Sequence, residues 1–241
     1  MKLNTNVSPD LDALSHAVLK EILANMKSAV AQRGRFSIAL SGGRTPEKLY
    51  SMWATDKYRN ETPWNQVHIF WGDERYVGAD HPLSNYRMTR ETLLNHVHIP
   101  PANVHPVPTQ LPTPAATADA YEAELKKYFG NEKPEFDVTL LGIGPEGHTA
   151  SLFPESPALL EKTRWVLPVV APAKPPNRVT LTLVVLNQSR NTYFLAAGKD
   201  KREILDAIRA EPDDKLSDYP AARIRPADGR VIWFLDQAAA E

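Results

Sequence analysis

The sequence predicts an α/β protein with a three-layer, Rossmann-like fold, in which helices cover both faces of a mostly parallel central sheet. Short apolar runs rich in β-branched residues end in glycine, and helical patterns follow several of these runs. That alternation is typical of parallel strands buried under helices. The chain has 241 residues, which is enough for one sizeable domain. We therefore expect residues 1–241 to form a single domain.

The first predicted element is an N-terminal helix. Its apolar residues recur at helical spacing: Leu11, Leu14, Val18, Ile22 and Met26. Ser8 can cap this helix, and Pro9 suits its first turn. Two strand–helix pairs follow. The first is a strand over residues 36–40 with a helix opened by Thr45-Pro46-Glu47, and the second is a strand over 67–71 with a helix over 85–95.

A proline-rich stretch separates the two halves of the chain. Residues 99–114 hold six prolines. Because the halves on either side complement each other as βα units, we expect an ordered surface connection rather than a linker between domains. A helix is then expected from residue 113 to about residue 130. The second half further predicts strands over 136–141, 166–170, 179–186, 193–196 and 231–235 and a helix over 199–209.

Composition narrows the classes of function. Lys and Arg number 28 and Asp and Glu 29, so the net charge is −1, and no overall basic field attracts nucleic acid or a membrane surface. Cysteine is absent, which excludes disulfides, thiolate nucleophiles and cysteine-based zinc sites and suits a reducing compartment. The polar N-terminus lacks the apolar core of a secretory signal, and no apolar run is long enough to span a bilayer. A cytoplasmic protein is expected.

A glycine-rich loop follows the first predicted strand. It reads Ser41-Gly42-Gly43-Arg44-Thr45-Pro46 and precedes a helix. Glycine lets the backbone approach a ligand closely, and a helix N-terminus offers unpaired N–H groups to an anion. The loop is therefore either a phosphate cradle or a tight turn that needs glycine for its dihedral angles. The spacing of a nucleotide P-loop and the three-glycine dinucleotide motif are both missing.

Two further strand ends carry chemically capable side chains. Asp73-Glu74-Arg75 follows the strand over 67–71, and it is either a cleft lining or a solvated charged loop. The strand over 136–141 ends in a loop with Gly142, Gly144, Gly147, Glu146 and His148. Histidine is the natural general base at neutral pH, and a nearby carboxylate can orient it. We favour a functional role for this loop because glycine, carboxylate and imidazole converge at a strand end.

Other charged residues and histidines carry weaker signals. Arg178 begins a predicted strand and Lys201 lies at a helix start, so both could bind phosphate, although spacing alone fits solvent-exposed charge equally. His96, His98 and His105 flank the proline-rich stretch without a carboxylate at ligand spacing. We therefore expect these three to be surface histidines and expect no metal site.

In chain order these motifs resemble the 6-phosphogluconolactonase family. Residues 41–46 look like its Ser-Gly-Gly-x-Thr-Pro loop, 71–77 like its Asp-Glu-Arg segment and 84–86 like its Ser-Asn-Tyr segment. Residues 142–154 resemble its long glycine–histidine signature, with Glu146 where many members have Asp. The likeness covers nearly the whole chain. It implies a fold like that of the glucosamine-6-phosphate deaminases and hydrolysis of 6-phospho-D-glucono-1,5-lactone to 6-phospho-D-gluconate.

The resemblance also implies roles for individual residues. His148 would be the general base, Glu146 its orienter and Arg75 a group near the lactone oxygen, with Asp73 beside it in the catalytic set. The residues expected to bind the sugar phosphate are Ser41, Gly42, Gly43, Thr45, Asn85, Gly147, Arg178 and Lys201. No cofactor is expected, since a lactone is already an activated ester. The expected partner is a small sugar-phosphate lactone, not nucleic acid or a membrane, and the expected assembly is a monomer or small homo-oligomer.

Two other functions fit the same fold. Glucosamine-6-phosphate deaminases resemble the chain in both glycine loops, but they usually place a carboxylate five residues after the loop histidine and Tyr after the Asp-Glu pair. Phe153 and Arg75 stand at those positions here, which favours the lactonase. The second alternative is a sugar-phosphate sensor without turnover. Related sensors carry a DNA-binding segment, and we expect none here because the fold begins almost at residue 1 and has no basic patch.

Overall fold

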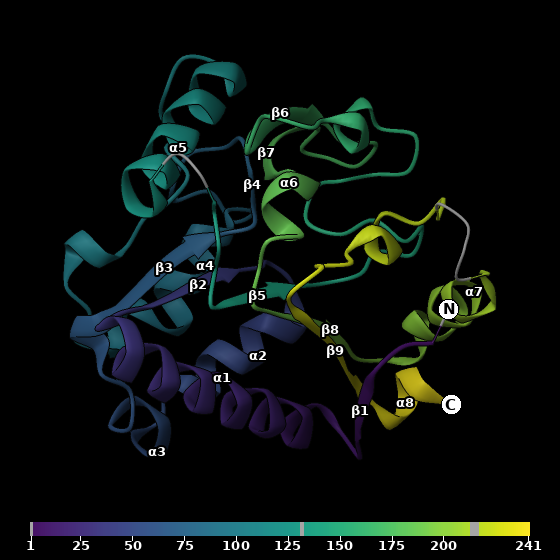
Figure 1. The fold of residues 1–241 in the computed structure, drawn as a ribbon, viewed down its shortest axis with the longest axis horizontal. Coiled ribbons are helices and arrows are strands. Elements are labelled where there is room, and N and C mark those ends of the chain that lie inside the picture. The colour runs from purple at the N-terminus through teal and green to yellow at the C-terminus, as the bar shows by residue number, and fades with distance from the viewer. Residues whose placement is uncertain (1, 131–132, 213–216) are drawn as a thin grey trace.

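The computed structural model describes residues 2–130, 133–212 and 217–241. A central sheet crosses the molecule, with α1 and α2 along one side of it and α5 and a smaller sheet on the other (Figure 1). The prediction of a three-layer α/β fold with a mostly parallel central sheet is confirmed. Within the described residues, no helix is long and apolar enough to cross a membrane.

The larger sheet has six parallel strands in the order β1-β9-β8-β5-β2-β3. They are β1 (Thr5–Ser8), β2 (Phe36–Leu40), β3 (Val67–Trp71), β5 (Val138–Leu141), β8 (Asn191–Ala196) and β9 (Arg230–Asp236). The smaller sheet is antiparallel, in the order β4-β7-β6. It consists of β4 (Asp73–Arg75), β6 (Val166–Val170) and β7 (Asn177–Leu181). Every residue of β2 and β5 is buried, which explains their mostly apolar sequences. The one polar residue of each strand is hydrogen-bonded, Ser37 to Asp137 and Thr139 to Ser189.

Eight helices connect the strands of the described chain. They are α1 (Leu11–Arg33), α2 (Arg44–Trp53), α3 (Asp56–Arg59), α4 (Asn85–Thr92), α5 (Pro114–Phe129), α6 (Leu183–Leu186), α7 (Arg202–Ala210) and α8 (Gln237–Ala240). Asp10, not Ser8, caps α1, because its carboxylate accepts from the Ala13 amide at 2.8 Å. Ser8 is instead the last residue of β1. The predicted start of α5 is confirmed, since the Thr113 hydroxyl caps its first turn.

The apolar run over 179–186 is divided between two elements. The predicted strand ends at Leu181, and Thr182 then precedes the short helix α6. A buried apolar run of this length reads equally as strand or helix by periodicity, so the sequence could not place the break. The predicted helix over 85–95 likewise ends early, at Thr92.

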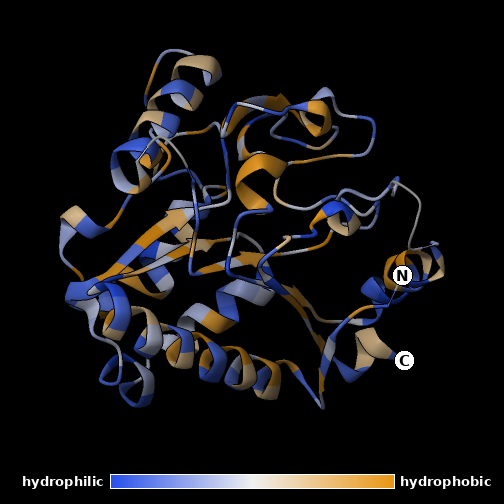
Figure 2. Cartoon of the chain, viewed as in Figure 1, coloured by the Kyte–Doolittle hydropathy of each residue, from blue (hydrophilic) through white to orange (hydrophobic). Residues whose placement is uncertain are grey.

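One cluster of buried apolar residues joins the two sheets. Ile38 and Leu140 contribute from the larger sheet, and Val166 and Val179 from the smaller one. In Figure 2 the hydrophobic colour follows the strands of the central sheet and the inward sides of the helices. This apolar cluster packs the antiparallel sheet against the carboxyl ends of the central strands. The candidate site lies between these two parts.

Candidate active site

A cavity of about 280 Å³ lies where β2, β5 and β8 of the central sheet end beside the antiparallel sheet. Its lining residues are Ser41, Gly42, Gly43, Asp73, Arg75, Asn85, Gly142, Ile143, Gly144, Pro145, His148, Ala150, Arg178 and Lys201. Nine of the twelve residues predicted for the site are among them. A second cavity of about 460 Å³ adjoins it and shares Gly42, Gly43 and Lys201. Carboxyl ends of parallel strands are the usual place for a ligand in such folds.

His148 lies on the loop that follows β5. Its Nδ1 is buried and lies 3.1 Å from Oε2 of Glu146. The two atoms lack the alignment of a hydrogen bond, so the pair is a close electrostatic contact. The ring packs against Phe153, with 4.4 Å between centroids. With Nδ1 turned to Glu146, Nε2 is the nitrogen left to act on a ligand in the cavity.

Glu146 carries a negative charge next to this imidazole. Partial burial would raise the pKa of Glu146, but its own backbone amide, His148 and Lys201 together bring it below the ordinary value. An ionised carboxylate beside Nδ1 stabilises a protonated imidazole. Glu146 does not line the main cavity and instead borders a groove along β6 with Phe153. Glu146 therefore contacts the imidazole of His148 from the side that faces away from the main cavity.

Two guanidinium groups face each other across the antiparallel ladder. Arg75 of β4 and Arg178 of β7 are paired in register, and both line the cavity. Arg178 is 7% exposed, and its Nε donates to the Pro175 carbonyl. Burial lowers the pKa of Arg178, Asp73 opposes that shift and the positive charge of Arg75 adds to it. Among the described residues no carboxylate lies within ion-pair distance of either group, so this pair of cations favours an anionic ligand.

Glu74 is a site residue that the sequence did not single out by itself. Its buried carboxylate accepts from the backbone amides of Asn85 and Tyr86, each at 2.8 Å, and from the Ser84 hydroxyl. Burial raises the pKa of Glu74, and these amide donors act against that shift. The carboxylate thereby fixes the first turn of α4. Only the adjacent motifs Asp-Glu-Arg and Ser-Asn-Tyr hinted at this pairing.

Asn85 positions Arg75. Its Oδ1 accepts from Nη1 of Arg75 at 2.7 Å, and its Nδ2 donates to the Asp73 carbonyl at 3.0 Å. A Cβ atom at Gly42 would lie 1.9 Å from that same Oδ1. Glycine at position 42 is therefore required by the close approach of this side chain. Since both ends of the amide are occupied, Asn85 supports the site more than it offers free groups to a ligand.

The carboxylate of Asp73 is also occupied by the protein. Its Oδ2 accepts from the Ser151 hydroxyl at 2.6 Å, and the side chain is 6% exposed. This hydrogen bond ties β4 to the loop that carries His148. Asp73 lines the cavity, and its bonded, buried state suits positioning better than proton transfer.

The glycine-rich loop leads into α2 with its backbone held in place. Tyr50 of α2 accepts from the Ser41 amide at 3.0 Å and donates to the Ser41 carbonyl at 2.8 Å. Gly43 has a φ of 108°, which favours glycine, and α2 has no side-chain cap. Its first N–H groups are thus open to the adjoining cavity, which Thr45 and Lys201 also line.

Gly147 lies beside the cavity rather than in its lining. Its φ is 77°, and a Cβ atom there would lie 2.6 Å from the Tyr219 ring. Its carbonyl accepts from the Ala221 amide at 2.9 Å. The residue therefore shapes the turn between Glu146 and His148, and Tyr219 is a contact that chain spacing could not reveal.

One expectation about the histidines was wrong. His96 and His98 are exposed as predicted, but His105 is buried, with its ring stacked on Phe70 at 4.2 Å and its Nε2 3.1 Å from Nδ1 of His68. The aromatic pocket beneath β3 accommodates this imidazole. The described residues contain no group of three or more His, Asp or Glu that could hold a metal ion.

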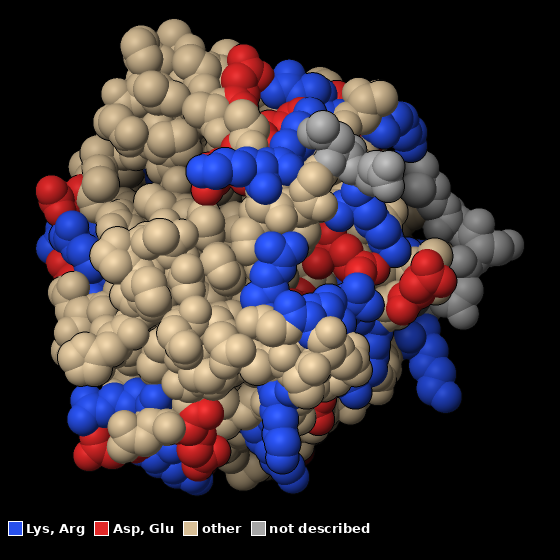
Figure 3. Space-filling view, turned by 60° about the vertical axis from the view of Figure 1, so that its left-hand side comes forward, with Lys and Arg blue, Asp and Glu red and all other residues tan. Residues whose placement is uncertain are grey.

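The surface in Figure 3 carries charges of both signs. Lys and Arg side chains gather on one part of this face with Asp and Glu among them, beside a broad uncharged area. On the face in view the basic groups are local and mixed with acidic ones.

Comparison with known proteins places the chain in a family. The profile of "Glucosamine-6-phosphate isomerases/6-phosphogluconolactonase" matches residues 9–233. A 6-phosphogluconolactonase of Synechocystis is 45% identical over 91% of this chain and 90% of its own. One of Rattus norvegicus is 39% identical over 92% of this chain and 89% of its own.

Solved structures agree with the sequence comparison. The crystal structure of 6-phosphogluconolactonase from Thermotoga maritima matches with a TM-score of 0.83 and 32% identity, covering 98% of this chain and all of that one. A monomeric glucosamine-6-phosphate deaminase shares the fold, with a TM-score of 0.80 at 18% identity over 98% of each chain. The chain therefore belongs to the glucosamine-6-phosphate isomerase/6-phosphogluconolactonase family, in which full-length relatives at about 40–45% identity are 6-phosphogluconolactonases.

Proposed function

We propose that this chain hydrolyses 6-phospho-D-glucono-1,5-lactone to 6-phospho-D-gluconate, the second step of the oxidative pentose phosphate pathway. The observation that carries the proposal is the cavity in which His148 lies with Arg75 and Arg178, two guanidinium groups without carboxylate partners among the described residues. A base beside two cations suits a substrate that has both an electrophilic carbonyl and an anionic group. The relatives named above support the same substrate.

In the proposed mechanism His148 activates water. Nε2 accepts a proton as the water oxygen attacks the lactone carbonyl carbon, and Glu146 stabilises the imidazolium from its place 3.1 Å from Nδ1. The tetrahedral intermediate then collapses with cleavage of the bond between the carbonyl carbon and the ring oxygen. The imidazolium returns its proton to that oxygen, which leaves the open-chain acid.

In this mechanism one cation acts on the lactone carbonyl, and the others bind the phosphate. Arg75, held by Asn85, stabilises the oxyanion of the intermediate. The phosphate is bound by the open α2 N-terminus at Gly42, Gly43 and Thr45 together with Arg178 and Lys201. Binding energy from the remote phosphate then orients the lactone ring for attack. An activated ester needs neither a metal nor a covalent intermediate for this reaction.

The glucosamine-6-phosphate deaminase activity of the superfamily is the second candidate. A deaminase needs an additional acid or base near the sugar, which relatives of that type usually place five residues after the loop histidine. Phe153 occupies this position and packs its ring on His148. An apolar ring cannot transfer a proton, so the geometry favours lactone hydrolysis.

The test is an activity assay with freshly prepared lactone, in which acid release is followed and the spontaneous rate subtracted. We expect rapid hydrolysis and no ammonia from glucosamine-6-phosphate. His148→Asn should lower kcat by about 10²–10⁴-fold, the usual contribution of a general base, with little change in 6-phosphogluconate binding. A folded His148→Asn protein with parental kcat would remove the base from the mechanism. Ammonia release at a comparable rate would instead assign the deaminase activity.

A cytoplasmic location, a single domain and a monomer or small homo-oligomer remain predictions from the sequence. Size measurement in solution decides the last of these.

A further inference from the structure

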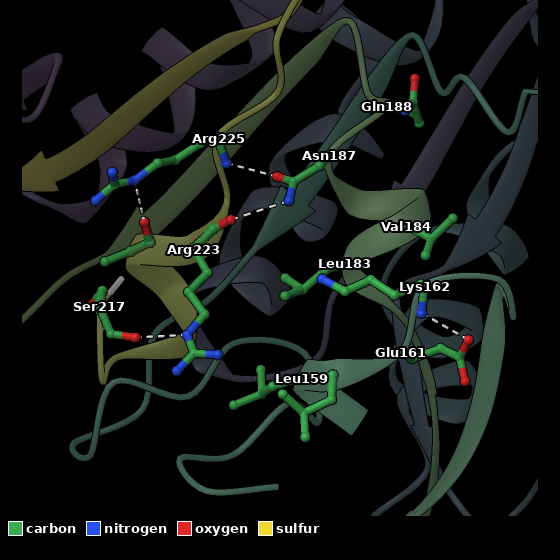
Figure 4. A pocket seen from close by; sticks show the side chains of 12 residues that line it. Leu159, Glu161, Lys162, Leu183, Val184, Asn187, Gln188, Ser217, Arg223 and Arg225 are labelled. Atoms are coloured by element: carbon green, nitrogen blue, oxygen red, sulfur yellow. Dashed lines mark hydrogen bonds between the residues drawn. The ribbon is translucent and has the colours of Figure 1, made fainter. Parts of the chain in front are cut away.

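A separate pocket of about 500 Å³ lies between α6 and two short 3-10 turns, Pro157–Leu160 and Pro220–Arg223 (Figure 4). Its lining residues are Leu159, Leu160, Glu161, Lys162, Leu183, Val184, Asn187, Gln188, Ser217, Ala222, Arg223 and Arg225. None of these lines the cavity proposed for the lactone. Its volume falls in the range of pockets that hold small organic molecules.

One wall of this pocket is apolar. Leu159 and Leu160 come from the first turn, and Leu183 and Val184 from α6. Leu160 is 72% exposed although it belongs to a large apolar residue type. Covering such a side chain with an apolar group is favourable, at about 25 cal/mol per Å² of buried surface.

The opposite wall carries a fixed cation. Nε of Arg223 donates to the Ser217 carbonyl at 2.6 Å, which sets the plane of the guanidinium. Figure 4 shows the end of this side chain directed toward the space between Leu159 and Leu183. In the described part of the chain, its terminal nitrogens have neither a hydrogen-bond acceptor nor a carboxylate at ion-pair distance. Lys162, also without a described carboxylate partner, extends over the pocket from the other wall in the same view.

Most other polar groups of the pocket have partners within the protein, and among the described residues the exposed Gln188 side chain is the exception. Oε1 of Glu161 accepts from the backbone amides of Arg164, Thr163 and Lys162, and these hydrogen bonds lower the pKa of Glu161 to about 2, so the carboxylate is ionised. Asn187 donates to the Arg223 carbonyl and accepts from the Arg225 amide. The pocket therefore offers a ligand the cations of Arg223 and Lys162 on one side and an apolar wall on the other, and the negative charge of Glu161 is directed at its own backbone amides.

We propose that this pocket binds a small organic anion with an apolar body. The anionic group, a carboxylate, sulfonate or phosphate, lies between Arg223 and Lys162, and the apolar body covers Leu160 and the α6 wall. A planar guanidinium held by one hydrogen bond can bind such an anion through its two remaining nitrogens. The cations of Arg223 and Lys162 favour an anion over a cation, and the leucine side gives a fully polar sugar little to contact.

The walls of the pocket continue into the loop that carries His148. The Ala221 amide donates to the Gly147 carbonyl at 2.9 Å, one residue before His148. On the other side the turn with Leu159 begins at Ser156, whose amide donates to the Phe153 carbonyl, and the Phe153 ring packs on His148. An anion that contacts both the Pro157–Leu160 turn and the Pro220–Arg223 turn therefore touches two segments that are hydrogen-bonded to the loop carrying His148. We expect its binding to alter kcat while leaving 6-phosphogluconate binding unchanged.

Anilinonaphthalene sulfonate, an aromatic anion that fluoresces on apolar burial, is a suitable probe. We expect a saturable site on the full chain whose Kd rises about tenfold or more in Arg223→Gln, because a charge-assisted contact is lost. Lys162→Gln should weaken binding less, since that side chain is exposed. Arg223→Lys should retain part of the affinity, and Lys20→Gln on the exposed side of α1 is the matched charge control, with parental Kd expected. Thermal melts show whether each variant is folded.

The fluorescence measurement of probe binding does not depend on the lactonase proposal, because it requires no substrate turnover. Equal affinity of the folded Arg223→Gln and parent proteins for the probe would overturn the assignment of the pocket. Displacement of the probe by saturating 6-phosphogluconate would overturn it too, by placing the probe in the lactone cavity. A kcat that does not change at saturating probe would overturn the link to the His148 loop.

Discussion

Replacing Gly144 by alanine tests whether the placement of His148 controls the rate. A Cβ atom at Gly144 would lie 2.0 Å from Nδ1 and Cε1 of the His148 ring. Ordinary contacts begin at 3.4 Å, so the ring must move by about 1.4 Å. A displacement of about 1 Å of a catalytic group can cost roughly 100-fold in rate. We therefore expect Gly144→Ala to lower kcat by about that factor, with little change in KM because the phosphate is bound elsewhere.

The assay follows acid release from freshly prepared 6-phosphogluconolactone, corrected for spontaneous opening. Gly78→Ala is the control, because a Cβ atom at Gly78 meets no atom within 4 Å and its φ is compatible with alanine. A thermal melt of each variant separates loss of activity from loss of fold. If folded Gly144→Ala retains the parental kcat, either the ring is not the base or its position does not limit the reaction.

Three more outcomes follow from the structure. Arg178→Gln should raise KM for the phosphorylated lactone by about tenfold or more and change hydrolysis of unphosphorylated gluconolactone little, because a charge-assisted contact is worth about 1.5–3 kcal/mol; an equal effect on both substrates would contradict a phosphate role. Burial, His105 and Arg35 lower the pKa of His68 from 6.5 to about 4. As the pH falls, the His68 imidazole takes up a proton in the unfolded chain before it does so in the folded protein, so the free energy of unfolding decreases between about pH 6.5 and pH 4. Thermal melts of His68→Gln should therefore show a smaller loss of stability over this pH range than melts of the parent. EDTA should leave turnover unchanged, and inactivation reversed by a divalent cation would refute this.

Short apolar strands were the most predictable part of the fold, in the central sheet and in the smaller one. The predicted bounds of β2, β3 and β6 agree with the structure, because each is a short apolar run closed by a turn. β1 escaped prediction because its sequence is polar and its first three residues are exposed, so only pairing with β9 identifies it as a strand. Asp73–Arg75 likewise reads as a charged loop and forms β4 only through its ladder with β7.

The site was predictable as a set of motifs but not as a set of contacts. The sequence identifies three parts of the site because each lies at the end of a recognisable strand: the glycine loops, His148 and the Asp-Glu-Arg segment. Their partners are not, since Ser151 meets Asp73 from 78 positions away along the chain. No spacing rule joins such residues, because Asp73 lies opposite Thr180 in the β4–β7 ladder and the Thr180 hydroxyl in turn accepts from the Ser151 amide. The burial of His105 was missed for the same reason: its aromatic pocket is assembled from separate elements.

The substitution of Glu for Asp at position 146 acquires a physical meaning from this geometry. The carboxylate and the imidazole belong to one short loop, which is held at Gly144 by the histidine ring and at Gly147 by Tyr219 and Ala221. The longer side chain of Glu146 reaches Nδ1 from outside the cavity, where 40% of the side chain remains exposed. Oε2, the oxygen that faces Nδ1, is buried but lacks the alignment of a hydrogen bond, so the carboxylate acts on the ring through its charge and does not fix the ring's orientation. Alignment of His148 therefore depends more on Gly144 and Phe153, which contact the ring itself, than on the carboxylate behind it.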